Sequence, residues 1–402
     1  MWPILTPRSG TDRARSGGHD RSDVMSSAAP LSVHWHPRTH DHEPPDGAFK
    51  LPSSSLLAVD EPHPDQPARV RNIKRMIEGT FGDDASFSLA DPASDPAIER
   101  VHDEEYLDWL ESFCAAGGGY VDGTTTAASP ATEDAVRHAV GAAIGATDRA
   151  LADASAVQYA LCRPSGHHAQ PDRADGFCFM NHAAIAAEHA LATADEVDRV
   201  AVVDWDVHHG NGTQEIFYDR DDVLVISIHN DHGSWDPTYH PQTGGLEEVG
   251  VGDGEGYTVN VPVPAGTGNE GYGRVFERLV EPIVTAYDPG VVLYSVGGDP
   301  GPSDPLGRNV VTRDGFRSLG RRARELAERC ANGRFALLQE GGYQISHLAY
   351  ATLGTLEGAT GRRFDLPDYG EGDPYAWLDE SMEPLEAALE EAREHHARYW
   401  FE

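Results

Sequence analysis

Short runs of apolar, largely β-branched residues recur along the chain from residue 157 onward, and they constrain its fold more than any other feature. Longer segments with helical periodicity lie between several of these runs. Strands of a parallel sheet are buried on both faces, so they read as continuous apolar runs rather than as an alternation of apolar and polar residues. The pattern therefore predicts an α/β fold in which helices cover both faces of a parallel sheet. The predicted strands are Val157–Cys162, Val200–Trp205, Val223–Ile228, Tyr257–Val263, Val291–Val296 and Phe335–Gln339.

The rest of the chain is organised around this regular part. Residues 31–130 are punctuated by Pro and Gly and are predicted to form long loops that contain two helices. We interpret residues 1–30 as a disordered tail in which Met25 is a candidate true start, residues 31–370 as one domain, and residues 371–402 as an acidic helical tail. No apolar run reaches the roughly 18 residues of a membrane-spanning helix. The predicted helices are Pro67–Glu78, Asp103–Phe113, Thr132–Ala152, Asn181–Ala194, Asn269–Ala286, Arg313–Cys330 and Tyr375–Tyr399.

The charge balance excludes several classes of partner. The chain has 66 Asp and Glu against 31 Lys and Arg, a net charge of −35, which repels nucleic acids and anionic lipid surfaces. We therefore expect no direct contact with nucleic acid and no membrane association. Lys50 and Lys74 are the only lysines, and an acidic, lysine-poor chain suits a salt-saturated cytoplasm in which ions screen self-repulsion. The hypothesis is a halophilic, haloarchaeal source, and four cysteines without paired spacing favour a reduced cytoplasm.

Polar side chains gather where four of the predicted strands end. Ligands of doubly wound sheets bind at the carboxyl ends of the strands, so these side chains are expected to share one site. Asp206 and His208 follow the strand Val200–Trp205 and point to the same side of an extended segment, which lets both reach one metal ion. Asp299, at the tip of another strand, supplies a third ligand. This set suits Zn²⁺, although Fe²⁺ or Co²⁺ would also fit, and the alternative is that Asp206 and His208 cap the following helix.

Two adjacent histidines, His167 and His168, follow a third strand. One is a candidate general base toward water, and the other is a candidate general acid or electrostatic partner. Asp204 and Asn211 are available to hold their tautomers. Tyr343, which follows two glycines at the end of a fourth strand, is a candidate hydroxyl donor to a developing oxyanion. The alternatives are a structural histidine pair and an ordinary buried tyrosine.

The motifs around these residues carry a family resemblance. Matching stretches run from about His36 to about Gly358, and the chain resembles the histone deacetylase superfamily, which includes acetylpolyamine amidohydrolases. Trp205 and Asn211 resemble the class II branch and its bacterial relatives. The most specific stretches are Arg163-Pro164-Ser165-Gly166-His167-His168, Gly176-Phe177-Cys178, the run DWDVHHGNGTQ from Asp204 to Gln214, Asp304-Pro305-Leu306-Gly307, and Glu340-Gly341-Gly342-Tyr343.

The resemblance implies an arginase/deacetylase fold, with an eight-stranded parallel sheet in a single domain. It implies a zinc-dependent amidohydrolase that removes acetyl or other acyl groups from acetyl-lysine side chains of proteins. His168 is the first choice for the general base, with its neighbour as electrostatic support. The zinc ligands and catalytic groups match residues already singled out: Asp206, His208 and Asp299 for the metal, His167 and His168 with their partners Asp204 and Asn211, and Tyr343.

The resemblance also implies a substrate channel and a second ion. Gly176 matches the position whose carbonyl meets the substrate amide, and Phe177 matches one aromatic wall of the channel. His240 stands where many relatives have Phe, which predicts a more polar channel. Leu306 stands where polyamine-preferring relatives carry an acidic residue, which favours an acyl-lysine substrate. Relatives hold a structural K⁺ near the zinc turn, and the matching residues are Asp204, Asp206, His208, Ser227 and Ile228.

Three other functions stay open at this point. An acetylpolyamine or other small-amide deacetylase would use the same site, and the acidic chain would attract cationic polyamines. A binuclear manganese ureohydrolase would need extra Asp and His ligands around the metal turn, and that pattern is absent from the sequence. A metal-binding scaffold without turnover would have lost Tyr343 or a tandem histidine, and the sequence keeps them. The oligomeric state is not predicted.

Overall fold

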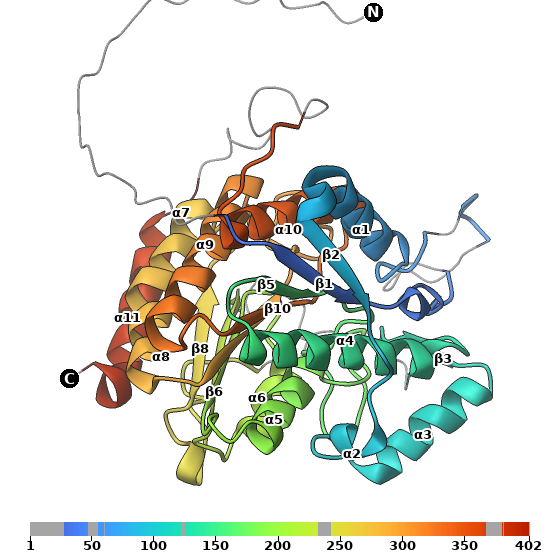
Figure 1. The fold of residues 1–402 in the computed structure, drawn as a ribbon, viewed down its shortest axis with the longest axis horizontal. Helices are drawn as coiled ribbons and strands as arrows, with labels where there is room; N and C mark the ends of the chain where they lie inside the picture. The colour runs from blue at the N-terminus through green and yellow to red at the C-terminus, as the bar shows by residue number, and fades with distance from the viewer. Residues whose placement is uncertain are drawn as a thin grey trace, which may run out of the picture.

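The structure, a computed structural model, describes residues 28–46, 55–59, 61–121, 125–231, 243–366, 380 and 382–401. An eight-stranded sheet forms its centre (Figure 1), with the strand order β2-β1-β5-β10-β9-β6-β7-β8. Neighbouring strands pair in parallel throughout this sheet, which confirms the predicted fold class. The strands are β1 Leu31–Trp35, β2 Ala85–Leu89, β5 Val157–Ala160, β6 Val200–Asp204, β7 Val223–Asn230, β8 Thr258–Val263, β9 Val291–Val296 and β10 Phe335–Gln339, and a separate small pair is formed by β3 Gly119–Tyr120 and β4 Ala127–Ala128.

Helices cover both faces of the sheet, as the apolar strands require. In β6, Ala201 and Val203 belong to one apolar core, whereas Val200 and Val202 belong to the other. Figure 1 shows α1, α9 and α10 on one side of the sheet and α4 and α5 on the other. The helices are α1 Ala68–Phe81, α2 Asp95–Ile98, α3 Glu104–Ala115, α4 Thr132–Ala152, α5 His182–Thr193, α6 Asn211–Phe217, α7 Asn269–Val275, a π-helical turn Phe276–Val280, α8 Glu281–Tyr287, α9 Arg313–Cys330, α10 Ile345–Thr360 and α11 Met382–Trp400.

The six predicted strands are all present, each within two residues of its predicted ends. The interpretation of residues 31–130 as loops around two helices is wrong where β1 and β2 lie. Strand β1 mixes apolar and polar residues, and β2 is an edge strand whose side chains are mostly exposed. Because neither strand is apolar on both faces, neither reads as a continuous apolar run. Helix α10 is likewise an addition to the predicted elements.

The strand order explains how distant parts of the chain meet. Strands β5, β10, β9 and β6 are consecutive neighbours in the sheet, and they run in the same direction. The loops that follow residues 160, 339, 296 and 204 therefore leave from one stretch of the carboxyl edge. These are the loops in which the candidate catalytic and metal-binding residues were found.

The two ends of the chain differ in what the structure describes. The predicted tail 1–30, with Met25, lies almost wholly outside the described residues. At the other end, α11 packs Leu385, Leu389 and Ala392 into the core beside β8. None of the helices within the described ranges combines the length and apolarity needed to span a bilayer.

Candidate active site

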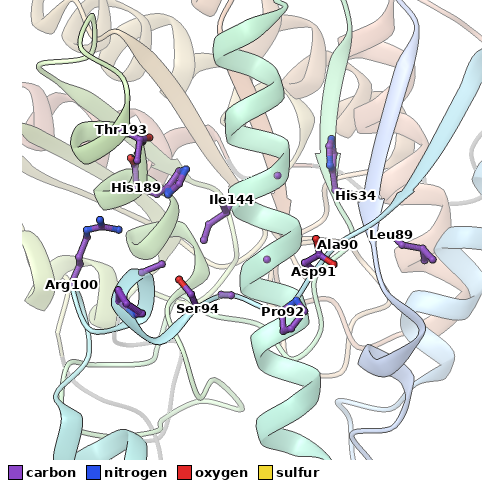
Figure 2. A pocket seen from close by; sticks show the side chains of 15 residues that line it. His34, Leu89, Ala90, Asp91, Pro92, Ser94, Arg100, Ile144, His189 and Thr193 are labelled. Carbon is purple, nitrogen blue, oxygen red and sulfur yellow. Dashed lines mark hydrogen bonds between the residues drawn. The ribbon is translucent and has the colours of Figure 1, made fainter.

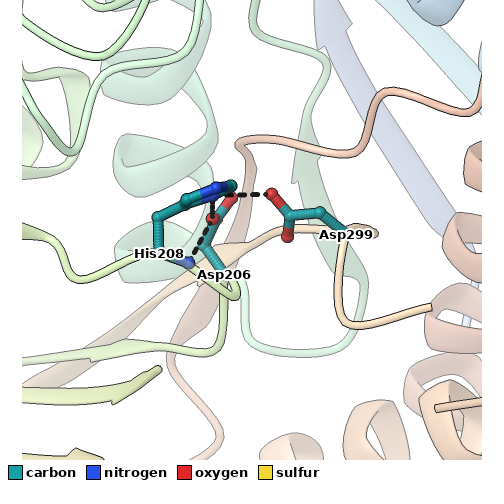
Figure 3. Close-up of side chains that lie close together, drawn as sticks. All are labelled: Asp206, His208 and Asp299. Atoms are coloured by element: carbon teal, nitrogen blue, oxygen red, sulfur yellow. Dashed lines mark hydrogen bonds and ion pairs between the residues drawn. The ribbon is translucent and has the colours of Figure 1, made fainter. Parts of the chain in front are cut away.

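Asp206, His208 and Asp299 come together at the carboxyl edge of the sheet, as their positions in the sequence predict (Figure 3). One potential ligand atom from each residue lies within 4.8 Å of the others, and all three residues are buried. Nδ1 of His208 lies 3.0 Å from Oδ1 of Asp206 and 3.2 Å from Oδ2 of Asp299. These three residues are called the metal cluster below.

Backbone groups fix the two carboxylates of the metal cluster. The N–H of Gly341 donates to Oδ2 of Asp206 at 2.8 Å, and the N–H of Val207 donates to Oδ1 of Asp299 at 3.0 Å. A Cβ on Gly341 or on Gly297 would overlap oxygens of both carboxylates. The two glycines therefore leave open the space that an ion between the ligands needs.

The metal cluster holds protons that a cation would replace. Burial lowers the pKa of His208, but its contacts with Asp206 and Asp299 outweigh burial and raise the pKa to about 9. Burial, together with repulsion from Asp206, raises the pKa of Asp299 to about 7. Two carboxylates are costly to bury unless positive charge accompanies them. The donor set therefore fits a divalent cation, whose binding would release these protons.

His167 lies beside the metal cluster, with two carboxylates close to its ring. Its Nδ1 is 2.8 Å from Oδ2 of Asp204, and its Nε2 is 3.8 Å from Oδ1 of Asp206. Burial lowers the pKa of His167, but Asp204, Asp206 and Glu340 together raise it well above its usual range. This imidazole is therefore suited to carry a positive charge.

His168 has a neutral partner instead. Its Nδ1 lies 2.6 Å from Oδ1 of Asn211, and because an amide oxygen only accepts, Nδ1 carries the hydrogen and Nε2 keeps its lone pair. Burial lowers the pKa of His168 well below its usual range, and the neighbouring His167 and His208 lower it further. This imidazole is therefore suited to accept a proton at Nε2.

Tyr343 borders the metal cluster from the loop that follows β10. A Cβ on Gly341 would lie 3.0 Å from the Tyr343 hydroxyl and would also overlap the carboxylates, so the hydroxyl and the carboxylates face the same space. The guanidinium of Arg69 lies 4.8 Å from the centre of the Tyr343 ring. Burial raises the pKa of Tyr343 well above its usual range, so the hydroxyl keeps its proton and acts as a donor.

Buried residues outside the predicted set fix this arrangement. Arg69 donates to the carbonyls of Gly342 and Glu340, each at 2.6 Å, and pairs with Asp65 at 2.5 Å. Asp304 accepts from the N–H of Tyr343 at 2.6 Å. The contacts of Arg69 join segments about 270 residues apart, and no local pattern marks them. The motif around Asp304 is the signal that could have found that residue.

The predicted channel residues are placed in part. Gly176 lies directly against one imidazole of the tandem pair, because a Cβ there would overlap the ring. Phe177 is buried, and its ring centre is 5.5 Å from that of Tyr343. Leu306 is half-buried in the loop after β9, and His240 lies outside the described residues. Gly176 and Phe177 therefore border the candidate catalytic groups.

The residues that match the potassium site lie on adjacent strands and on the turn that follows. Asp204 ends β6 and pairs in register with Ser227 of β7, and Ile228 comes next on that strand. Oγ of Ser227 accepts from the N–H of Gly210 at 3.4 Å and lies 3.0 Å from Nδ1 of His229. Asp204 and Ser227 therefore lie side by side, and bound K⁺ stays a prediction.

Two hollows are lined by residues outside the metal cluster. One, of about 540 Å³, lies across α4 and is lined by residues that include His34, Asp91, Arg100 and His189 (Figure 2). None of the residues that line this hollow belongs to the metal cluster or to the candidate catalytic groups. The second, of about 720 Å³, is lined in part by Asn211. It therefore reaches the amide behind the tandem histidines.

Known proteins resemble this chain in sequence and in fold. The family profile described as the histone deacetylase domain matches residues 63–359. Histone deacetylase 8 of Arabidopsis thaliana is 36% identical over 371 residues, which cover 92% of this chain and 97% of that protein. A histone deacetylase-like amidohydrolase of Pseudomonas aeruginosa is 39% identical over 308 residues, which cover 76% of this chain and 79% of that protein. The crystal structure of the HDA15 HD domain matches with a TM-score of 0.78 at 29% identity, over 92% of this chain and 95% of that one.

Proposed function

The chain belongs to the histone deacetylase domain family, and from this premise we propose that it is a zinc-dependent amidohydrolase that removes acetyl groups from the acetyl-lysine side chains of proteins. One observation carries the proposal: a buried metal cluster, two histidines with unlike partners and a tyrosine hydroxyl gather at one point of the sheet edge. Relatives named deacetylase and amidohydrolase support an acylated amine as the substrate.

The metal cluster, Asp206, His208 and Asp299, would hold the ion. Two carboxylates and one imidazole suit Zn²⁺, and Fe²⁺ or Co²⁺ would bind to the same donors. When bound, the ion polarises the amide carbonyl and lowers the pKa of water toward roughly 7. The space left by Gly297 and Gly341 between the carboxylates supports this assignment.

The side chains around the metal cluster would then move protons and stabilise charge. Nε2 of His168 takes a proton from the attacking water and later gives it to the leaving lysine amine. His167, positively charged beside Asp204, stabilises the negative charge that develops on the amide oxygen. The hydroxyl of Tyr343 donates a hydrogen bond to the same oxygen.

Substitution of Tyr343 by Phe tests the oxyanion role. We expect Tyr343→Phe to lower kcat by about 10²–10³, the loss typical of one oxyanion donor. Steady-state kinetics with an acetyl-lysine peptide measures the loss, and metal analysis of the same samples checks that the ion stays bound. Wild-type activity in the metal-loaded variant would refute the role.

An acetylated polyamine is the second candidate substrate. The net charge of −35 favours it, because an acidic protein attracts polycations. Leu306 counts against it, since leucine at this half-buried position has no carboxylate with which to bind a second amine. High salt would also screen the long-range attraction. We therefore place protein acetyl-lysine first.

We infer that the protein works in the cytoplasm of a halophile. Its acidity and its two lysines support this setting, as do the four cysteines, which are all free and buried. Abundant K⁺ would then occupy the predicted second ion site near Asp204 and Ser227. We expect a higher melting temperature in multimolar KCl than in low salt, and equal stability in both would contradict the setting.

The substrate class is tested by direct competition between the two candidates. The zinc-loaded protein in high KCl is given an acetyl-lysine peptide or N-acetylputrescine, and a hydroxamate serves as the inhibitor control. The expected result is a larger kcat/KM for the peptide, with hydrolysis abolished by the hydroxamate. A larger kcat/KM for N-acetylputrescine would transfer the function to small-molecule metabolism.

A further inference from the structure

The carboxylate of Asp175, which the proposed reaction does not use, is hydrogen-bonded to Asn211. The Nδ2 group of Asn211 donates to Oδ2 of Asp175 at 3.1 Å, while its Oδ1 lies 2.6 Å from Nδ1 of His168. Asp175, Asn211 and His168 thus form a chain of two hydrogen bonds. Asp175 and Asn211 also line the hollow of about 720 Å³, so this chain leads from the hollow to the tandem histidines.

The direction of this chain decides which nitrogen of His168 carries the hydrogen. A side-chain amide can turn over and exchange its oxygen and its NH₂ group. Oδ2 of Asp175 accepts from the NH₂ groups of both Gln170 and Asn211, so the amide oxygen of Asn211 faces His168. With the amide turned over, its NH₂ group would donate to Nδ1, the hydrogen of His168 would reside on Nε2, and Nε2 could not accept a proton.

Asp175 is held by the turn on which it lies. Its N–H donates to the carbonyl of Cys178 at 3.1 Å, and its carbonyl accepts from the N–H of Cys178 at 2.7 Å. Nε2 of Gln170 donates to Oδ2 of Asp175 at 3.4 Å. The same turn carries Gly176 and Phe177, which border the catalytic groups. The carboxylate is therefore presented to Asn211 from a fixed backbone.

We propose that Asp175 is a positioning residue, which fixes the orientation of the Asn211 amide and thereby the tautomer of His168. The other histidine needs no such residue, because the Asp204 carboxylate accepts from it with either oxygen. The kinetic consequence rests on the proposed function, whereas the tautomer is a property of the folded protein alone.

Kinetics of single variants give the first test. We expect Asp175→Ala to lower kcat about ten- to a hundredfold, a part of what a general base contributes, with KM changed less than about twofold. Asp175→Asn keeps the shape of the side chain, but its amide both donates and accepts, so it should not fix Asn211 and should lose about as much kcat as Asp175→Ala. Asp172→Ala removes an exposed carboxylate from the same loop and serves as the matched control with unchanged kcat. Equal kcat for Asp175→Ala and the control would overturn the proposal.

The Asn211→Asp background distinguishes a positioning role of Asp175 from simple support of the turn on which it lies. In Asn211→Asp, the new carboxylate accepts from His168 in either rotation, so the orienting residue is no longer needed. We expect Asp175→Ala to cause no further loss in that background, where the Asp175 carboxylate would instead repel the new one. An equal loss in both backgrounds would show that Asp175 only supports the turn with Gly176 and Phe177, and would overturn the proposal.

The tautomer is read without any substrate. ¹⁵N-histidine labelling of the zinc-loaded protein, with the His168 signals assigned from His168→Ala, reports which ring nitrogen is protonated. We expect hydrogen on Nδ1 in the wild type and a shift toward Nε2 in Asp175→Ala. Should that variant not fold, Asp175→Ser replaces it, because a hydroxyl both donates and accepts and does not fix the amide. An unchanged tautomer overturns the inference, whereas the expected shift without acetyl-lysine hydrolysis overturns the proposed function alone.

Discussion

The two tandem histidines are adjacent in the sequence and both buried, yet the structure surrounds them differently. His167 faces Asp204, a carboxylate that ends β6, whereas His168 faces Asn211, an amide that begins α6. Burial alone would lower the pKa of both imidazoles. The nearby carboxylates reverse that effect for His167, and the neutral amide does not reverse it for His168.

The partner, rather than burial, therefore decides which of the two rings favours a positive charge. The ring centres are only 4.1 Å apart, so a charge on one disfavours a charge on the other. A positively charged His167 therefore helps to keep His168 neutral, and a neutral imidazole with its lone pair on Nε2 is what a general base requires. In the proposed reaction, the unlike partners would therefore give the two rings different roles.

Removal of each ring in turn gives the largest expected effect. We expect His168→Ala to lower kcat by about 10³ or more, near the upper part of the range for general acid–base groups. The fall in kcat for His167→Ala should be about tenfold smaller than for His168→Ala, because this change removes electrostatic support and leaves the base in place. Rates of acetyl-lysine peptide hydrolysis at matched metal content decide the order. A larger loss in His167→Ala would assign the base to the other ring.

Exchange of the carboxylate partner gives a smaller effect. Asp204→Asn would present His167 with an amide, as Asn211 presents to His168, and should lower the pKa of His167. We expect kcat to fall about ten- to a hundredfold, within the range that partners of catalytic groups and ligands show. Metal analysis must accompany the kinetics, because Oδ1 of Asp204 also accepts from the N–H of Asp206. An unchanged kcat would show that the charge of His167 plays no part.

The reverse exchange, Asn211→Asp, should change the pH dependence of the reaction. His168 has a lowered pKa, so the wild type should keep its activity below pH 6.5, where an ordinary imidazole takes up a proton. In Asn211→Asp a carboxylate favours the protonated ring and raises its pKa by about one unit or more. The acid limb of the kcat/KM profile should therefore shift to higher pH by that amount. An acid limb at the same pH in the variant and the wild type would show that protonation of His168 does not cause it.

The sequence predicts the centre of the molecule better than its edges. The central strands are apolar on both faces, and the metal ligands follow them directly, so a local pattern marks both. Strands β1 and β2 carry polar side chains, so no apolar run marks them. The roles of Asp175 and Arg69 were not predicted, because their partners come from other elements and no spacing in the sequence indicates such contacts.

Removal and return of the metal ion test whether hydrolysis depends on the metal cluster. Acetate release from an acetyl-lysine peptide in high KCl is measured for the protein as purified, after chelation, and after addition of Zn²⁺. We expect the wild type to lose its activity with the ion and to regain it with Zn²⁺, and Asp299→Ala to regain none. Equal hydrolysis by the metal-free and zinc-loaded protein would refute a metal-dependent reaction at this site.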